Sequence, residues 1–265
     1  MPTRRARRLT ALGGLVLVVA GCGPSRVRVS YRPSNGSRAT YRIEVHAVAV
    51  TRIADLAPHR SVDDEVLIAR HAVLGAQGGD RQVRVELSSP GGELRTFVVR
   101  IDRAAQLTEV QEIEGLLAQV LGGLGLSEIF PEAAGAPPER ALAPGDRWTI
   151  DQPVRIGGPS ARLTGSGRLA SLGLRHGRKV ATIESDFRLP VDRTTGDSPT
   201  RLHLQGTQTT TATATRDVAD GTIETETAHT AGAFQLLVLP PAGVPGPAIP
   251  GTLDVQIRSV TRRER

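Results

Sequence analysis

Apolar and polar side chains alternate along most of the chain from residue 41 onward. Between Tyr41 and Ala49 the odd positions are apolar or aromatic, whereas Arg42, Glu44 and His46 are polar. A period of two over this length predicts a half-buried strand. Further strands are predicted at 62–74, 83–87 and 97–101, with glycine-rich turns between them. Short strands joined by such turns indicate an antiparallel meander.

The period changes between residues 106 and 130. Six apolar residues follow one another at spacings of three, four, three, one and three: Val110, Ile113, Leu117, Val120, Leu121 and Leu124. This spacing predicts an apolar stripe along one side of a helix. Three glutamates lie in the first part of this segment, where a helix dipole favours anions. Glycines at 122, 123 and 125 are expected to end the helix. The segment 104–147 is therefore expected to contain a central amphipathic helix and a proline-rich connector.

A second run of strands begins at Trp148. Segments 165–174 and 179–189 predict a hairpin that turns at His176–Gly177, and a terminal strand is predicted at 253–257. The expected fold is mainly β (α+β): a curved antiparallel sheet or half-barrel in two β halves, with the helix packed on one face. The β-rich domain spans 38–265, and its halves are 38–103 and 148–265. Two small domains divided near residue 135 are the alternative.

A threonine-rich hairpin is predicted over residues 200–229, with its turn at Asp220–Gly221. One face of its first arm carries Thr207, Thr209, Thr211, Thr213 and Thr215, and the other carries Gln208, Thr210, Ala212 and Ala214. Neither face has a bulky apolar residue, so the arm buries little and its register is weakly specified. It is interpreted either as an exposed edge or projecting hairpin, or as a small-residue wall beside a ligand cavity. O-glycosylation is a third interpretation.

The N-terminus has the order of a secretory signal peptide. Residues 1–8 are basic, 9–20 are mostly apolar, and Val19-Ala20-Gly21-Cys22 follows. Twelve helical residues rise about 18 Å, short of the roughly 30 Å of a bilayer core. The Val19–Cys22 sequence resembles the lipobox of bacterial lipoproteins. That resemblance implies cleavage after a signal peptide 1–21, diacylglycerol and palmitate-type acylation on Cys22, and a lipidated tether 22–37.

The connector ends in Pro144-Gly145-Asp146-Arg147-Trp148, which opens the second β half. Together with the lipobox, this Gly-Asp-x-Trp step resembles an uncharacterised family of bacterial envelope lipoproteins, which has no assigned activity. Trp148 is expected to anchor the core at the start of a strand. A weaker likeness is to curved-sheet lipoproteins that enclose an acyl chain. It implies an apolar ligand held between sheet and helix, beside Val110, Ile113, Leu117, Val120 and Leu121.

Composition and charge argue against several kinds of partner and site. The formal charge is +6, but four arginines lie in the first eight residues, and without them 29 basic residues face 27 acidic ones. A nearly neutral body argues against nucleic acid as a partner. Cys22 is the single cysteine, which excludes an intramolecular disulfide and cysteine-based zinc sites. The six histidines lack metal-ligand spacing, and no phosphate loop or nucleophile elbow is present, so neither cofactor nor metal is expected.

The sequence therefore predicts a non-catalytic lipoprotein, anchored through Cys22 to the extracytoplasmic side of a cell membrane. Its expected ligand is a lipid or another apolar molecule. The alternative is a structural or protein-interaction module of the cell envelope, whose protein partner the sequence does not identify. A hydrolase with residues scattered over several strands is the third hypothesis.

Overall fold

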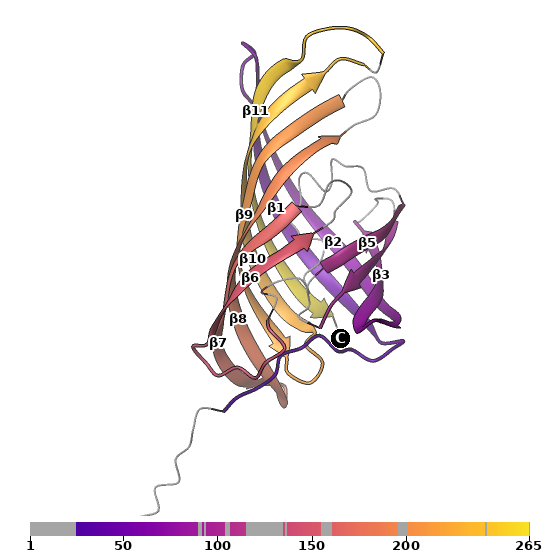
Figure 1. The fold of residues 1–265 in the computed structure, drawn as a ribbon, viewed down its shortest axis with the longest axis vertical. Coiled ribbons are helices and arrows are strands. Elements are labelled where there is room, and N and C mark those ends of the chain that lie inside the picture. The colour runs from indigo at the N-terminus through magenta and orange to yellow at the C-terminus, as the bar shows by residue number, and fades with distance from the viewer. Residues whose placement is uncertain are drawn as a thin grey trace, which may run out of the picture.

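The computed structural model describes residues 25–89, 92, 94–103, 107–114, 135, 137–154, 161–195, 201–241 and 243–264. In these ranges the chain forms one antiparallel sheet of eleven strands and no helix (Figure 1). The strands are β1 (Arg38–Ile53), β2 (His59–Gln77), β3 (Asp80–Ser88), β4 (Arg95–Ile101), β5 (Leu107–Glu114), β6 (Arg147–Val154), β7 (Ala161–Arg175), β8 (Arg178–Thr195), β9 (Arg201–Asp217), β10 (Ile223–Leu239) and β11 (Ile249–Glu264).

The two β halves are parts of one sheet. Its order is β5-β4-β3-β2-β1-β11-β10-β9-β8-β7-β6, so every neighbour is also a neighbour in sequence except the pair β1–β11. That pair runs antiparallel from Thr40↔Glu264 to Ile53↔Gly251 and joins the first half to the second. The prediction of a continuous antiparallel sheet is confirmed, and the two-domain alternative is wrong. Strands β5 and β6 are its two edges, and the sheet is not closed by hydrogen bonds between them.

The predicted central helix is not supported, because its first part is strand β5. Leu107, Val110 and Ile113 are three residues apart, which matches a helical stripe, yet they pair with successive inward positions of β4. The register shifts between Val98 and Val99 and again between Arg100 and Ile101. Each shift inserts one residue on β5 and turns a period of two into a period of three. The bulge between Val110 and Ile113 therefore accounts for their spacing of three, whereas Leu117, Val120, Leu121 and Leu124 of the predicted stripe lie outside the described residues.

One face of the sheet carries the hydrophobic core, and we call it the inner face. On β1, for example, Tyr41, Ile43 and Val45 are buried, and they alternate with residues that face solvent. The main cluster unites residues of β2–β4 with residues of β6–β10, which are far apart in the sheet order. The sheet therefore bends round its own core, as Figure 1 shows.

The segment Val27–Pro33 crosses one end of the sheet, and we call it the N-terminal strap. Val27 exchanges backbone hydrogen bonds with Leu142 at 2.8 and 2.7 Å, and Tyr31 N–H donates to the carbonyl of Arg103 at 2.8 Å. Val29 and Tyr31 are buried in the core. These residues fall within the predicted tether 22–37, but they pack against the sheet.

Candidate functional site

The threonine-rich hairpin lies in the middle of the sheet. Strand β9 pairs along its whole length with β8 and β10, so the interpretation as an edge or projecting hairpin is wrong. The inner face of β9 buries Thr210, Ala212 and Ala214, and its outer face exposes Thr209, Thr211 and Thr213. On the inner face, the hydroxyls of Thr210 and Thr230 form a hydrogen bond of 2.9 Å between their Oγ1 atoms. Small residues therefore line the inner face at its centre.

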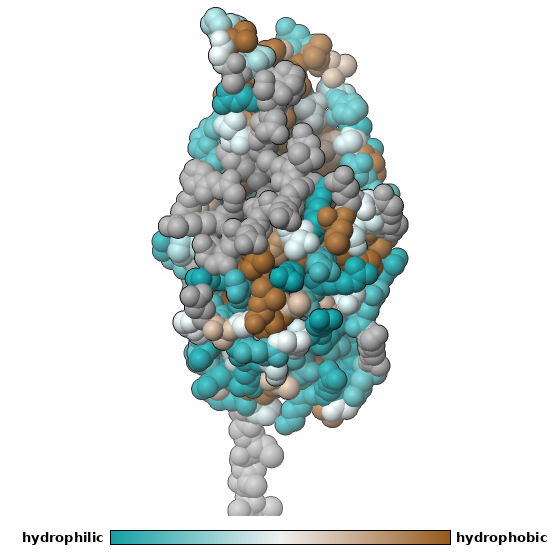
Figure 2. Space-filling model, turned by 90° about the vertical axis from the view of Figure 1, so that its right-hand side faces the viewer, coloured by the Kyte–Doolittle hydropathy of each residue, from teal (hydrophilic) through white to brown (hydrophobic). Residues whose placement is uncertain are grey.

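Apolar side chains continue along the inner face toward the end of the sheet opposite the strap. They are only partly buried and pack against the edge of the main cluster: Ala47, Ala49, Ile53, Leu189, Val191, Leu202 and Leu253. They come from β1, β8, β9 and β11. On the side of the molecule seen in Figure 2, hydrophilic residues cover most of the described surface, and hydrophobic residues gather near its middle.

Only two of the five residues predicted as ligand contacts lie in the described part of the chain. Val110 and Ile113 lie on β5, where their backbones pair with Val99 and Phe97. The other predicted contacts, Leu117, Val120 and Leu121, lie outside the described residues, as does the predicted lipid attachment site, Cys22.

The Gly-Asp-x-Trp step forms the turn that opens β6. Gly145 has a φ of 95°, in the left-handed region that favours glycine. Asp146 Oδ2 accepts the backbone N–H of Ala143 at 3.0 Å. This hydrogen bond, helped by Arg140 and opposed by partial burial, lowers the pKa of the Asp146 carboxyl below its ordinary value. The motif is thus a structural turn.

Trp148, two residues after this turn, is the anchor that the sequence predicted. Its indole N–H donates to the carbonyl of Gly135 at 2.9 Å. The ring packs against both hydrophobic clusters and lies over Gly167, its cross-strand partner on β7. A Cβ atom at position 167 would lie 2.3 Å from Trp148 Cε2. Glycine is therefore required beneath the indole.

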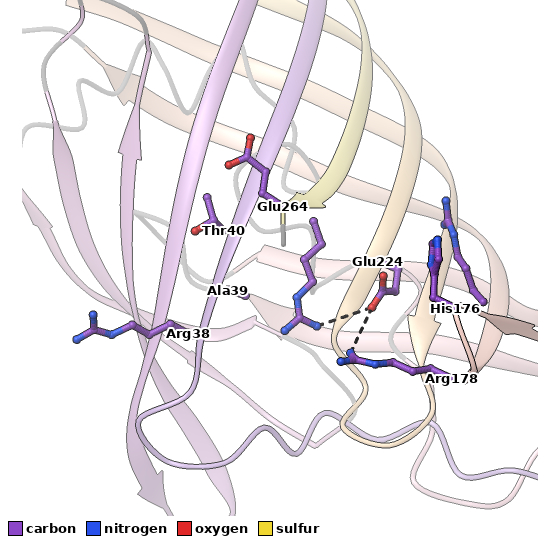
Figure 3. A pocket seen from close by; sticks show the side chains of 9 residues that line it. Arg38, Ala39, Thr40, His176, Arg178, Glu224 and Glu264 are labelled. Carbon is purple, nitrogen blue, oxygen red and sulfur yellow. Dashed lines mark ion pairs between the residues drawn. The ribbon is translucent and has the colours of Figure 1, made fainter.

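A pocket of about 540 Å³ lies at the strap end of the sheet (Figure 3). The starts of β1 and β10, the end of β11 and the β7–β8 turn line it. Its basic lining residues are Arg38, Arg175, His176, Arg178 and Arg263. The acidic ones are Glu224 and Glu264, and Ala39 and Thr40 complete the wall. None of these residues was singled out as a ligand contact in the sequence, because they come from segments far apart in the chain.

His176 and Gly177 form the tight turn between β7 and β8, as the sequence predicted. Their φ angles are 50° and 78°, so both adopt left-handed backbone conformations. Two successive residues of this kind are typical of the type I′ turn, for which Asn-Gly is the preferred sequence. His176 thereby lies at the tip of the hairpin, on the pocket wall (Figure 3).

A second, smaller cavity of about 30 Å³ adjoins the pocket and shares Arg38, Ala39 and Arg263 with it. The strap residues Tyr31 and Pro33 form part of its wall. The pocket and the strap therefore lie at the same end of the molecule.

Two close pairs of titratable side chains outside the pocket are on exposed surfaces. His46 Nδ1 lies 2.7 Å from Asp64 Oδ1, and Arg162 bonds Asp151 through two nitrogens at 2.6 and 2.9 Å. Among the described residues, no three His, Cys, Asp or Glu side chains gather closely enough to hold a metal ion. Within the same ranges, the structure has no helix long and apolar enough to span a bilayer.

Comparisons with known proteins identify no relative. No protein-family model matches the chain, and no curated protein matches it. A solved structure of OmpTdeltaL8, a loop L8 deletion mutant of the Vibrio cholerae outer membrane protein OmpT, aligns with 87% of this chain and 100% of its own. Its sequence identity is 6% and its TM-score is 0.18, and this likeness carries no inference about fold or function.

Proposed function

We propose that the chain is a lipid-anchored, extracytoplasmic bacterial lipoprotein that binds an apolar ligand on the inner face of its sheet. The proposed anchor is Cys22, which follows a basic and then apolar N-terminus. Cys22 is five positions before Val27, where the strap begins to pair with Leu142. An extended chain of that length spans at most about 18 Å. An anchored body would therefore lie close to the bilayer, with its strap end toward it.

The observation that carries the ligand proposal is the partly buried apolar set on the inner face. Leu189, Val191 and Leu253 extend the core beyond the residues that are fully buried. Apolar surface with a few polar groups, inside a concave wall, is the usual form of a site for a small apolar molecule. At the centre of this wall the side chains of β9 and β10 are small, as at Ala212 and Ala228.

The sheet has a feature that fits binding without catalysis. Two of its described ion pairs, His46–Asp64 and Arg162–Asp151, lie on exposed surfaces. Much of the inner face presents methyl and methylene groups, which bind by burial of apolar area, beside buried polar side chains such as Arg216 and Glu226.

The anchor is tested by replacing Cys22 with serine in the full chain. We expect the native protein in the membrane fraction, with an acylated N-terminal Cys22 in its mass spectrum, and the C22S variant outside that fraction or unprocessed. An unmodified thiol on a protein released from membranes contradicts the anchor.

Ligand binding is tested by native mass spectrometry and lipid extraction of the protein from its own membrane. Ala49→Trp places a large ring on the inner face, and Val50→Trp places the same ring on the outer face of β1. We expect bound apolar molecules in the native protein and in V50W, and several-fold less in A49W at equal thermal stability. Equal occupancy in both variants contradicts the inner-face site. Absence of any bound molecule, with a reproducible protein crosslink in cells, would instead favour the interaction module.

A further inference from the structure

The pocket at the strap end has an excess of positive charge. Four arginines and two glutamates line it. Glu224 is the acidic group at its back, and only 17% of its side chain is exposed. Arg178 Nη1 and Arg263 Nη1 each lie 3.9 Å from Glu224 Oε1, beyond hydrogen-bonding distance (dashed lines in Figure 3). One carboxylate thus faces two guanidinium groups without using their hydrogen-bond donors.

Thr222 and Asp220 hold the side chain of Arg263 in place. Its Nη1 donates to Thr222 Oγ1 at 2.8 Å, and that hydroxyl donates to Asp220 Oδ1 at 2.6 Å. Only 22% of the Arg263 side chain is exposed. This chain of hydrogen bonds fixes the guanidinium at the cost of one of its five N–H donors. A ligand would therefore pay little conformational entropy to engage it.

Arg175 and Arg178 reach the pocket from the two ends of the β7–β8 turn. Arg175 Nη1 donates to Thr225 Oγ1 at 3.2 Å, and Arg178 Nη1 donates to Asp217 Oδ2 at 3.4 Å. Each contact orients one end of a guanidinium. Arg38, by contrast, points away from the other labelled side chains in Figure 3. The other three arginines of the pocket lining, Arg175, Arg178 and Arg263, each make a contact that orients the side chain.

Three oriented guanidinium groups in the lining of one pocket are the kind of donor set that binds a tetrahedral oxyanion. Their planar forks bind phosphate oxygens with paired N–H donors, and such charge-assisted hydrogen bonds are about twice as strong as neutral ones. The pocket volume of about 540 Å³ falls in the range of small-molecule sites and exceeds the need of a bare ion. We infer that this pocket binds the phosphate group of a phosphoester, through Arg175, Arg178 and Arg263. The inference rests on the pocket alone and not on the inner-face ligand.

The same chemistry has two sources, a lipid headgroup or a soluble phosphate compound. The test uses the full-length protein in non-ionic detergent micelles and measures heats of binding by titration calorimetry. One arm adds inorganic phosphate and glycerol phosphate. A second arm adds micelles that contain phosphatidylglycerol, with diacylglycerol micelles as the control that has the same acyl chains and no phosphate.

The variants are Arg175→Gln and Arg178→Gln, both on exposed side chains of the turn. Arg258→Gln is the matched control, because Arg258 is exposed on the outer face of β11 and outside the pocket lining. Loss of one charge-assisted hydrogen bond is expected to weaken binding about tenfold in R175Q and R178Q. Binding to R258Q should equal that of the native protein. Equal thermal melting of all three variants would show that the effect is local.

Each outcome has a defined meaning. Phosphate binding that both pocket variants weaken supports the site. The same sensitivity toward phosphatidylglycerol identifies a lipid headgroup, whereas binding in the first arm alone identifies a soluble phosphoester. No heat at millimolar phosphate, or an equal loss in R258Q, overturns the inference.

Discussion

Replacing Gly167 with alanine should destabilise the whole second β half through Trp148. Gly167 is buried on β7, and its backbone φ is ordinary, so the substitution acts through space and not through backbone strain. The new Cβ would lie 2.3 Å from Cε2 and 2.4 Å from both Cζ2 and Nε1 of the indole. The ring must therefore move.

The expected decrease in the free energy of unfolding has two contributions. Forcing a methyl group into a filled site costs about 1–3 kcal/mol. Displacing the indole also removes its hydrogen bond to the Gly135 carbonyl, which contributes about 0.5–1.5 kcal/mol. We expect the free energy of unfolding to fall by about 2–4 kcal/mol. The urea midpoint should then fall by about 1 M, for a slope of about 3 kcal/mol per molar.

The assay is urea unfolding of the full chain, followed by tryptophan fluorescence. Trp148 is the single tryptophan, so the emission reports this site alone. We expect a red shift in folded Gly167→Ala, because the ring moves toward water. Gly173→Ala on the same strand is the matched control, since the nearest atom to its Cβ is Val180 Cγ2 at 3.9 Å. That control should be neutral or gain up to about 1 kcal/mol.

A double-mutant cycle tests whether the clash with the indole causes the destabilisation by Gly167→Ala. In a Trp148→Leu background, followed by circular dichroism, the cost of Gly167→Ala should fall below about 1 kcal/mol. A cost that stays the same without the indole, or an unchanged midpoint in Gly167→Ala itself, would refute the packing argument.

Three other predictions follow from particular contacts. His176→Asn should raise the free energy of unfolding by about 0.5 kcal/mol, because asparagine suits the left-handed turn better; an unchanged or lower thermal midpoint would contradict this. Thr210→Val and Thr230→Val should each cost about 1 kcal/mol in urea unfolding and cost less together than their sum, whereas strict additivity would show that their hydrogen bond contributes nothing. The bidentate Arg162 holds the pKa of Asp151 below its ordinary value, so Arg162→Gln should raise that pKa in an NMR titration; the stability advantage of the native pair should be present near neutral pH and disappear as the pH falls through the lowered pKa.

Several parts of the fold were accessible from local pattern. The alternation that begins at Tyr41 and the Phe97–Ile101 segment both correspond to strands, β1 and β4. The turn at His176–Gly177 and the position of Trp148 at the start of β6 were also predictable. Alternation and turn chemistry depend on residues next to one another, so they are readable without the fold.

The failures have a common physical origin. The spacing of three between Val110 and Ile113 reads as helical because a bulge shifts the β4–β5 register between them, and a bulge is a property of the paired strands. The threonine-rich arm has no bulky side chains, yet it is central because β8 and β10 pair with both of its edges. A strand's place in a sheet depends on its partners.

The amino-acid sequence by itself determined most strands, the main turns, the nearly neutral body and the lipobox-like N-terminus, since each resides in a few consecutive residues. Only the tertiary structure decided that β1 pairs with β11, that the strap packs on the sheet, and that Arg175, Arg178 and Arg263 meet at one pocket. The strands β1 and β11 are separated by almost the whole chain. Pairing over that distance is selected by the register and burial of the complete sheet, which no local window contains.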